Sequence, residues 1–167
     1  MDEKNKKNMK KMKMIIMASM LVLAVVFVSG CIGDITDPIN DDYVWEATIQ
    51  GETFGLPEGF NLTTTDISSL AEIYLYSDGT DESESLVIAY YPLYSTKEIL
   101  SLMKDNPSYS NIKEDVTLGG QTGFTANFKS DDGTNSKIFI FEKGGKVFGI
   151  ELTEGFNFEE SIPKIIK

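Results

Sequence analysis

The chain contains no histidine among its 167 residues. Imidazole is the side chain whose ordinary pKa lies nearest neutrality, and it is a common catalytic base and metal ligand. Its absence excludes Ser-His and Cys-His nucleophile pairs and imidazole-based zinc sites. We therefore expect a protein that is not an enzyme and that needs no cofactor.

Arginine is also missing, because all 15 basic residues are lysines. Arginine alone presents a planar fork that holds a phosphate or carboxylate through two parallel hydrogen bonds. Cysteine occurs once, at Cys31, which excludes an internal disulfide. Hydrophobic residues make up 41% of the chain, enough for one folded core.

Charge is divided sharply at the single cysteine. Six lysines and two acidic residues precede Cys31, a net charge of +4, whereas nine lysines and 24 acidic residues lie from Cys31 onward, a net charge of −15. Such an acidic body repels phosphate backbones, so we expect no nucleic-acid partner. It also repels anionic lipid, so membrane attachment would need something other than a basic patch.

The first thirty residues have the pattern of an export signal. Lysines between residues 4 and 13 form a basic segment, and residues 14–30 follow without any charge. This apolar run is shorter than the roughly 20 residues of a comfortable membrane span, and its flanks are typical of a signal peptide. The lysines predict that the start of the chain lies on the cytoplasmic side of the membrane, and the acidic residues predict that the body lies on the outer side.

The apolar run ends in Val28-Ser29-Gly30-Cys31, which resembles the lipobox of prokaryotic lipoprotein precursors. The resemblance implies cleavage between Gly30 and Cys31 and lipid attachment to the Cys31 sulfur. The alternative is an uncleaved signal anchor in which Cys31 is an incidental small residue. Both interpretations place the body outside the cytoplasmic membrane, and we expect a lipid-anchored protein at the cell surface.

The organisation expected is therefore a signal peptide (1–30), an acidic tether (31–42) and one folded domain (43–167). The domain alternates apolar and polar residues with period two, most clearly in AEIYLYS (71–77), which predicts strands. STKEILSLMKD (95–105) predicts a helix, with Ser95 and Glu98 as a capping box. Asn157 and Glu160 suggest a second capping box before a short helix that Pro163 kinks or shortens. Strands, a helix, a meander and a terminal helix predict an α+β fold in which helices pack on an antiparallel sheet.

Three stretches of this domain resemble the PsbP-like superfamily, in the form found in small prokaryotic, particularly archaeal, membrane lipoproteins. They are FGLPEGF (54–60), the Gly119-Gly120 turn with the following TGFTANF, and EKGGKVFGIELT (142–153) with the short helix after it. The resemblance covers 43–167 and lies in hydrophobic pattern and turn placement. It implies a helix-flanked antiparallel sheet and no shared active site. Known members of the family include non-catalytic subunits of membrane complexes and many proteins of unknown role.

Few residues are candidates for chemistry. Asp131, Asp132 and Asn135 surround Gly133 in a way that resembles part of a calcium loop, but the spacing of a full loop is missing and Asp-Gly also suits a hairpin turn. The acidic loop Asp78, Asp81, Glu82 and Glu84 is best interpreted as a solvated tip. Asn61-Leu62-Thr63 is a sequon, so Asn61 is a candidate for N-glycosylation.

The function expected is that of a lipid-anchored, extracytoplasmic, non-catalytic binding or docking protein with a protein partner at the cell surface. A small surface hydrolase would instead need a carboxylate with a raised pKa in a concave pocket. A structural assembly factor of a membrane complex would need an exposed apolar patch.

Overall fold

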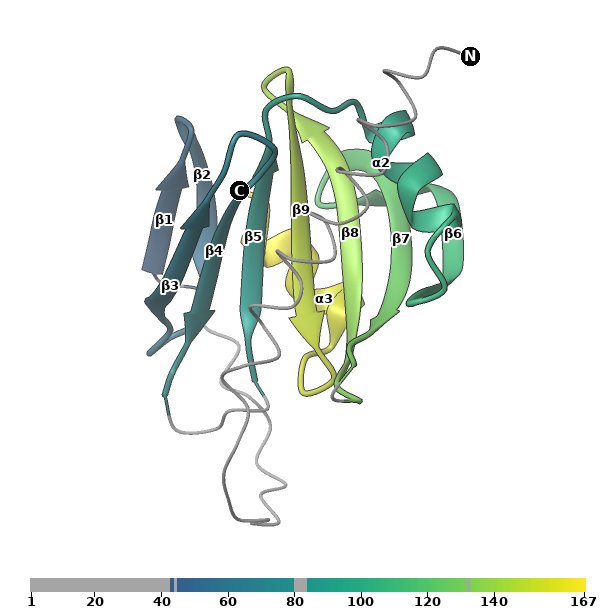
Figure 1. Cartoon of the computed structure of the whole chain (residues 1–167). Coiled ribbons are helices and arrows are strands. Elements are labelled where there is room, and N and C mark those ends of the chain that lie inside the picture. The colour runs from purple at the N-terminus through teal and green to yellow at the C-terminus, as the bar shows by residue number, and fades with distance from the viewer. Residues whose placement is uncertain (1–42, 44, 80–83, 132) are drawn as a thin grey trace.

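A computed structural model describes residues 43, 45–79, 84–131 and 133–167 (Figure 1). Nine strands and two helices form this part of the chain. The strands are β1 (Trp45–Ile49), β2 (Glu52–Leu56), β3 (Asn61–Ile67), β4 (Glu72–Ser77), β5 (Leu86–Tyr91), β6 (Tyr109–Leu118), β7 (Gln121–Lys129), β8 (Asn135–Lys143) and β9 (Lys146–Thr153). The helices are α2 (Thr96–Lys104) and α3 (Phe158–Ile165).

The expected α+β fold class is wrong. Strands hold 55% of the described residues and helices 14%, so the domain is mostly antiparallel β-sheet. The reason lies in the layer that covers the sheet: β1 and β2 pair with each other outside the main sheet and share one face with α3, so helices form a smaller part of that layer than we expected. The signal or transmembrane helix expected before the domain lies outside the described residues. Within those residues, neither helix has the length and apolar character needed to span a membrane.

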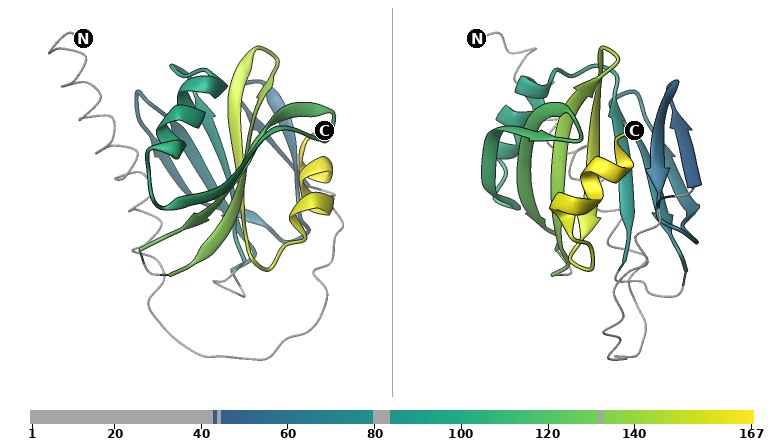
Figure 2. Two further views of the ribbon diagram at one scale, coloured as in Figure 1. Left: turned by 90° about the vertical axis from the view of Figure 1, so that its right-hand side faces the viewer. Right: turned by 180° about the vertical axis from the view of Figure 1, so that it is seen from behind.

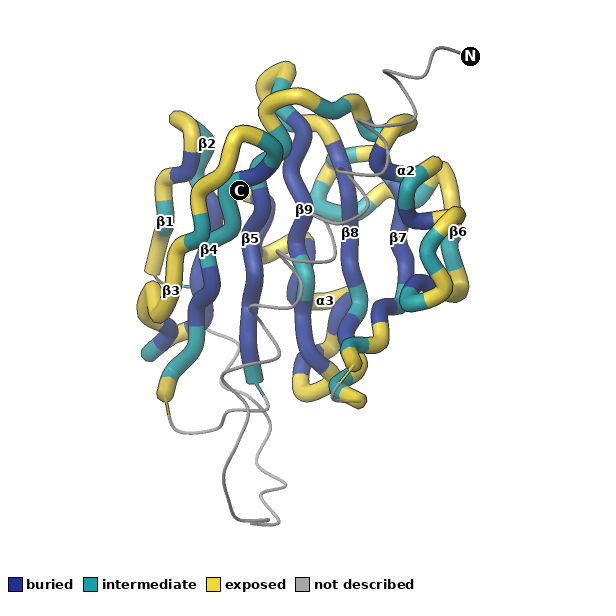
Figure 3. The backbone as a smooth tube through the Cα atoms, in the orientation of Figure 1, coloured by how far each residue is buried: buried dark blue, intermediate teal, exposed yellow. Residues whose placement is uncertain are grey.

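The main sheet contains seven strands in the order β3-β4-β5-β9-β8-β7-β6, and every neighbouring pair is antiparallel. After β5 the chain passes through α2 to the far edge of the sheet. It then returns by the meander β6-β7-β8-β9, and β9 pairs with β5. Burial is greatest along the central strands β5, β9 and β8, which lie in the middle of the sheet (Figure 3).

One face of this sheet carries Phe139 and Ile150 and is named the α3 face. Helix α3 and the β1–β2 hairpin cover it, and together they enclose the larger core cluster. Phe54 of the hairpin contacts Phe148 of β9 edge to face, with ring centroids 5.1 Å apart. Side chains with no exposed surface, such as Phe54, are the ones whose burial contributes most to stability.

The opposite face carries Ile138 and Ile140 and is named the α2 face, because α2 packs on it (Figure 2). Ile99 and Met103 are the buried residues of α2. The predicted capping box is confirmed: the Glu98 backbone N–H donates to the Ser95 hydroxyl, and the Ser95 N–H donates to the Glu98 carboxylate. This box fixes the start of α2 because it satisfies N–H groups that the helix itself leaves unpaired.

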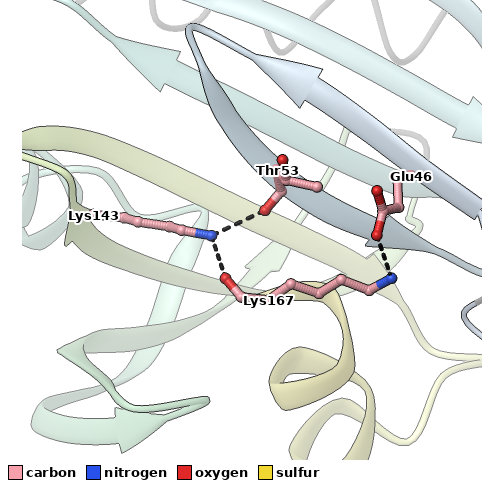
Figure 4. Close-up of polar contacts among 4 residues, drawn as sticks. All are labelled: Glu46, Thr53, Lys143 and Lys167. Carbon is pink, nitrogen blue, oxygen red and sulfur yellow. Dashed lines mark hydrogen bonds and ion pairs between the residues drawn. The ribbon is translucent and has the colours of Figure 1, made fainter.

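A lysine network joins the hairpin to the rest of the domain (Figure 4). The Lys143 Nζ donates to the backbone oxygen of Thr53 at 2.9 Å and to that of Lys167 at 2.6 Å. The Lys167 Nζ lies 2.9 Å from a carboxylate oxygen of Glu46. The network therefore connects β1, β2 and β8 with the residues that follow α3.

Candidate ligand-binding hollow

A hollow of about 450 Å³ lies on the α3 face, between the ends of β7, β8 and β9 and the start of α3. Its volume is within the range of small-molecule sites. Polar side chains form one wall and apolar side chains another. The polar wall includes Asn127, Lys129, Asn135 and Lys137, and the apolar wall includes Leu152, Phe156 and Phe158.

The register of β7 and β8 creates the polar wall. Asn127 lies opposite Lys137, and Lys129 lies opposite Asn135. Directly opposed residues share a face of the sheet, as do residues two apart on one strand. Two amides and two ammonium groups therefore alternate on one patch, which we call the Asn/Lys wall.

The apolar wall is rigid because its aromatic rings are packed. Phe156 contacts Phe60 edge to face, with centroids 5.7 Å apart, and both rings are buried. The Lys137 Nζ lies 4.5 Å from the centroid of the Phe158 ring, a cation–π contact that holds this ammonium at the meeting point of the two walls.

Glu159, in the first turn of α3, binds the ammonium group of Lys137. This hydrogen bond is the main cause that holds the pKa of Glu159 below its usual value, and the charges of Lys137 and Lys113 act in the same direction. The predicted capping box is wrong at this helix, because the Asn157 side chain makes no capping hydrogen bond. Anions are favoured beside a helix N-terminus, and here the carboxylate of Glu159 takes that position.

Two of the nine lysines that follow Cys31 line this hollow, Lys129 and Lys137, and the charge of Lys113 acts on Glu159. The ammonium of Lys129 forms no ion pair with any described residue, and Lys129 is exposed. Glu154 is an acidic member of the lining. The arrangement offers ammonium charge and amide donors and acceptors, which suits binding of a polar anion.

A different carboxylate, Glu151, lies on the α2 face. The Ser136 hydroxyl donates to it at 2.6 Å. Burial raises the pKa of Glu151, and the serine hydrogen bond partly offsets that rise. Burial is the main cause of the raised pKa values of Tyr91 and Tyr109, and the charge of Glu151 adds to both. Glu151 does not belong to the lining of the hollow.

Several of the residues predicted from sequence are not among those that the structure describes. Gly30, Cys31 and Asp132 lie outside the described residues, as do Asp81 and Glu82 of the acidic loop. Asn61 is exposed at the start of β3, where its amide donates to the Gly59 oxygen at 2.8 Å. This exposure leaves Asn61 accessible to a modifying enzyme.

The calcium-like segment forms a turn in which the Gly133 N–H donates to the Ser130 oxygen at 3.0 Å. Gly133 has a φ of +94°, a conformation that glycine adopts without strain. Asp131 and Asn135 are both exposed, and Asn135 belongs to the Asn/Lys wall. The described residues contain no group of three or more acidic or cysteine side chains that could hold a metal ion.

Sequence reasoning missed the Asn/Lys wall. The signal was present on both sides of the turn, where NFK (127–129) and NSK (135–137) each place Asn and Lys two residues apart. Pairing across the turn aligns the two segments in antiparallel order. The acidic residues of the turn itself are the more prominent feature of this stretch, and they concealed the pattern on either side.

No family model matches the chain, and comparison with curated proteins gives no match. Inference about function therefore depends on the geometry of the hollow and on the sequence pattern.

Proposed function

We propose that this protein is a non-catalytic binding protein, held on the outer side of the cell membrane by lipid on Cys31, and that its hollow takes a small anionic ligand. The observation that carries the proposal is the Asn/Lys wall. In a body with a net charge of −15, ammonium and amide groups converge on one hollow beside a packed apolar wall. Concave sites with a few placed polar groups are the usual form of ligand sites.

The lipid anchor is supported by the order of segments in the sequence. A basic segment, an uncharged run and Val28-Ser29-Gly30-Cys31 follow one another, and acidic residues come next. Because the body repels anionic headgroups, the lipid would supply the attachment that charge cannot. The tether would then let the hollow face the medium outside the cell.

The binding part is tested by amine acylation of the full chain purified in detergent micelles. Acetate, D-glucuronate and inorganic phosphate serve as probes, and peptide mass spectrometry measures the rate at each lysine. We expect at least one anion to slow acylation of Lys129 several-fold. Lys97 of α2, which is exposed and outside the hollow, is the internal control. If none of the three probes changes the acylation rate at Lys129, the proposal is contradicted.

A protein partner at the cell surface is a second candidate, and the edge strand β3 favours it. Six of its seven residues are exposed, including Leu62 and Ile67, which are 52% and 66% exposed. An uncovered edge can accept a strand from another chain. β3 has one register shift, between Leu62 and Thr64. The opposite edge, β6, has two register shifts and left-handed residues at Asn111 and Asp115, which hinder such pairing more.

A small hydrolase is the third candidate, and the raised pKa of Glu151 is the observation in its favour. Retaining and inverting glycosidases both use a pair of carboxyl groups. Within the described residues, the side chain that hydrogen-bonds to Glu151 is the hydroxyl of Ser136 and not a second carboxyl group. The hollow therefore supports binding better than Glu151 supports hydrolysis.

A further inference from the structure

Glu159 binds a lysine that lines the hollow, Lys137, and so marks a place at its margin that accepts a carboxylate. Its side chain binds Lys137 at the first turn of α3, and Lys113 adds a second favourable charge. The protein itself thus places an anion where the Asn/Lys wall, the Phe158 ring and the helix N-terminus meet.

The two partners of this ion pair differ in how firmly they are held. The Lys137 side chain is 29% exposed and lies over the Phe158 ring, whereas the Glu159 side chain is 66% exposed. Rotation about the side-chain bonds of Glu159 can carry its carboxylate into solvent without moving α3. Exposed ion pairs of this kind are weak, so a competing anion can replace one partner.

We propose, building on the binding function, that Glu159 is an internal stand-in for the ligand, which is a hydroxylated carboxylic acid such as an acidic sugar. The ligand carboxylate displaces Glu159 from Lys137 and also contacts Lys129. Asn127 and Asn135 bind the hydroxyl groups, and the rings of Phe156 and Phe158 contact the carbon skeleton.

The chemistry of the hollow favours this class over phosphate. The chain has no arginine, so it lacks the fork that grips a phosphate through two parallel bonds. An amide side chain both donates and accepts, which matches a hydroxyl group that does the same. The aromatic wall suits a ring with apolar faces, whereas inorganic phosphate has no apolar part.

The experiment again uses acylation of the full chain in detergent micelles, with D-glucuronate, D-glucose and inorganic phosphate as probes. Protection of Lys129 measures binding. We expect glucuronate to protect Lys129 at lower concentration than phosphate does, and glucose to give no protection. In Glu159→Gln without any probe, Lys137 should react faster than in the unaltered protein. The concentration of glucuronate for half-protection should fall about two- to fivefold, the range expected when a weak exposed competitor is removed.

Glu160→Gln is the matched control, because Glu160 is exposed in the same turn of α3 and loses the same charge. It should leave both readouts unchanged, and thermal melting should show that both variants remain folded. Equal effects of the two substitutions would mean that general charge, and not Glu159, sets the affinity. That result would overturn the stand-in role while leaving glucuronate binding intact. Protection by phosphate or glucose equal to that by glucuronate would overturn the ligand class, and no protection by any anion would overturn the proposed function itself.

Discussion

Glu151 shows how one residue can link stability to pH. Its carboxylate is partly buried on the α2 face, and the pKa is raised mainly by burial. In the unfolded chain the pKa returns to its ordinary value of 4.5. Between that value and the higher folded pKa, the folded state binds more protons than the unfolded state, so this residue lowers stability as pH rises.

We predict that Glu151→Gln increases the free energy of unfolding at neutral pH relative to the unaltered protein. Gln accepts the Ser136 hydrogen bond and carries no charge to desolvate. The difference between the two proteins should be smallest near pH 4 and should grow as pH rises through the folded pKa. Urea unfolding from pH 4 to 8 measures it, with Glu142→Gln as the exposed control on β8. A difference that shrinks with rising pH would show that the sign is wrong.

Among the elements, the β1–β2 hairpin depends most on contacts from far along the chain. Phe54 of β2 and Ile49 of β1 are buried in the larger core, and Lys143 donates to the Thr53 oxygen between them. The hairpin is a separate sheet, and no described strand of the main sheet forms a backbone ladder with it. A two-stranded sheet alone is marginal in water, so its side-chain contacts with the main sheet hold it in place.

We predict that Lys143→Met loosens this hairpin. Loss of the ammonium leaves the part-buried Thr53 oxygen without this donor, at a cost of about 1 kcal/mol. Trp45, the one tryptophan of the chain, lies on β1 and reports on the hairpin by its fluorescence. In the variant, the fluorescence of Trp45 should change at a lower urea concentration than the sheet signal in circular dichroism does. Lys97→Met is the control. If both signals of Lys143→Met change together, at the urea midpoint of the unaltered protein, the prediction is wrong.

Local patterns in the sequence predicted local structure well. Ser95 and Glu98 lie three residues apart, which is the spacing of a capping box, and the structure confirms this box. Strict alternation in 71–77 predicted a strand, which the structure confirms as β4. These features depend on neighbours within a few residues, so composition and period suffice to find them.

The features that sequence patterns missed depend on packing between distant segments. Asn157 has the side chain of a cap, yet that side chain does not cap α3. The same limit concealed the fold class, because nothing local in residues 45–56 states that the hairpin will cover a sheet formed much later in the chain. The hollow required both the β7–β8 register and the placement of α3, and only the first could be inferred from the turn.

For the whole molecule, the proposed anchor is the feature that decides where the domain works. Cys31 is the single thiol, so one substitution removes every route to thioether lipid attachment. We predict that Cys31→Ser either releases the protein from membranes or leaves it unprocessed. Intact mass and Triton X-114 partitioning of the membrane and soluble fractions measure the outcome. Ser29→Ala, which keeps a small residue before the thiol, should behave like the unaltered protein. In Cys31→Ser, a mass that differs from the unaltered protein only by the sulfur-to-oxygen replacement, with unchanged partitioning, would refute the anchor.

The order of strands in the seven-stranded sheet also has a consequence for how the chain reaches its native state. Five of the six ladders of that sheet join strands that follow one another in sequence, and β5–β9 alone joins distant ones. The segments β3-β4-β5 and β6-β7-β8-β9 can each assemble through short-range contacts, whereas β5–β9 must close the long loop that contains α2 and the meander. Loop closure adds an entropic cost before the distant contact can form, and such contacts slow folding. We therefore expect β3-β4-β5 and β6-β7-β8-β9 to fold as two cooperative units. The β5–β9 ladder, at the centre of the sheet, should form last.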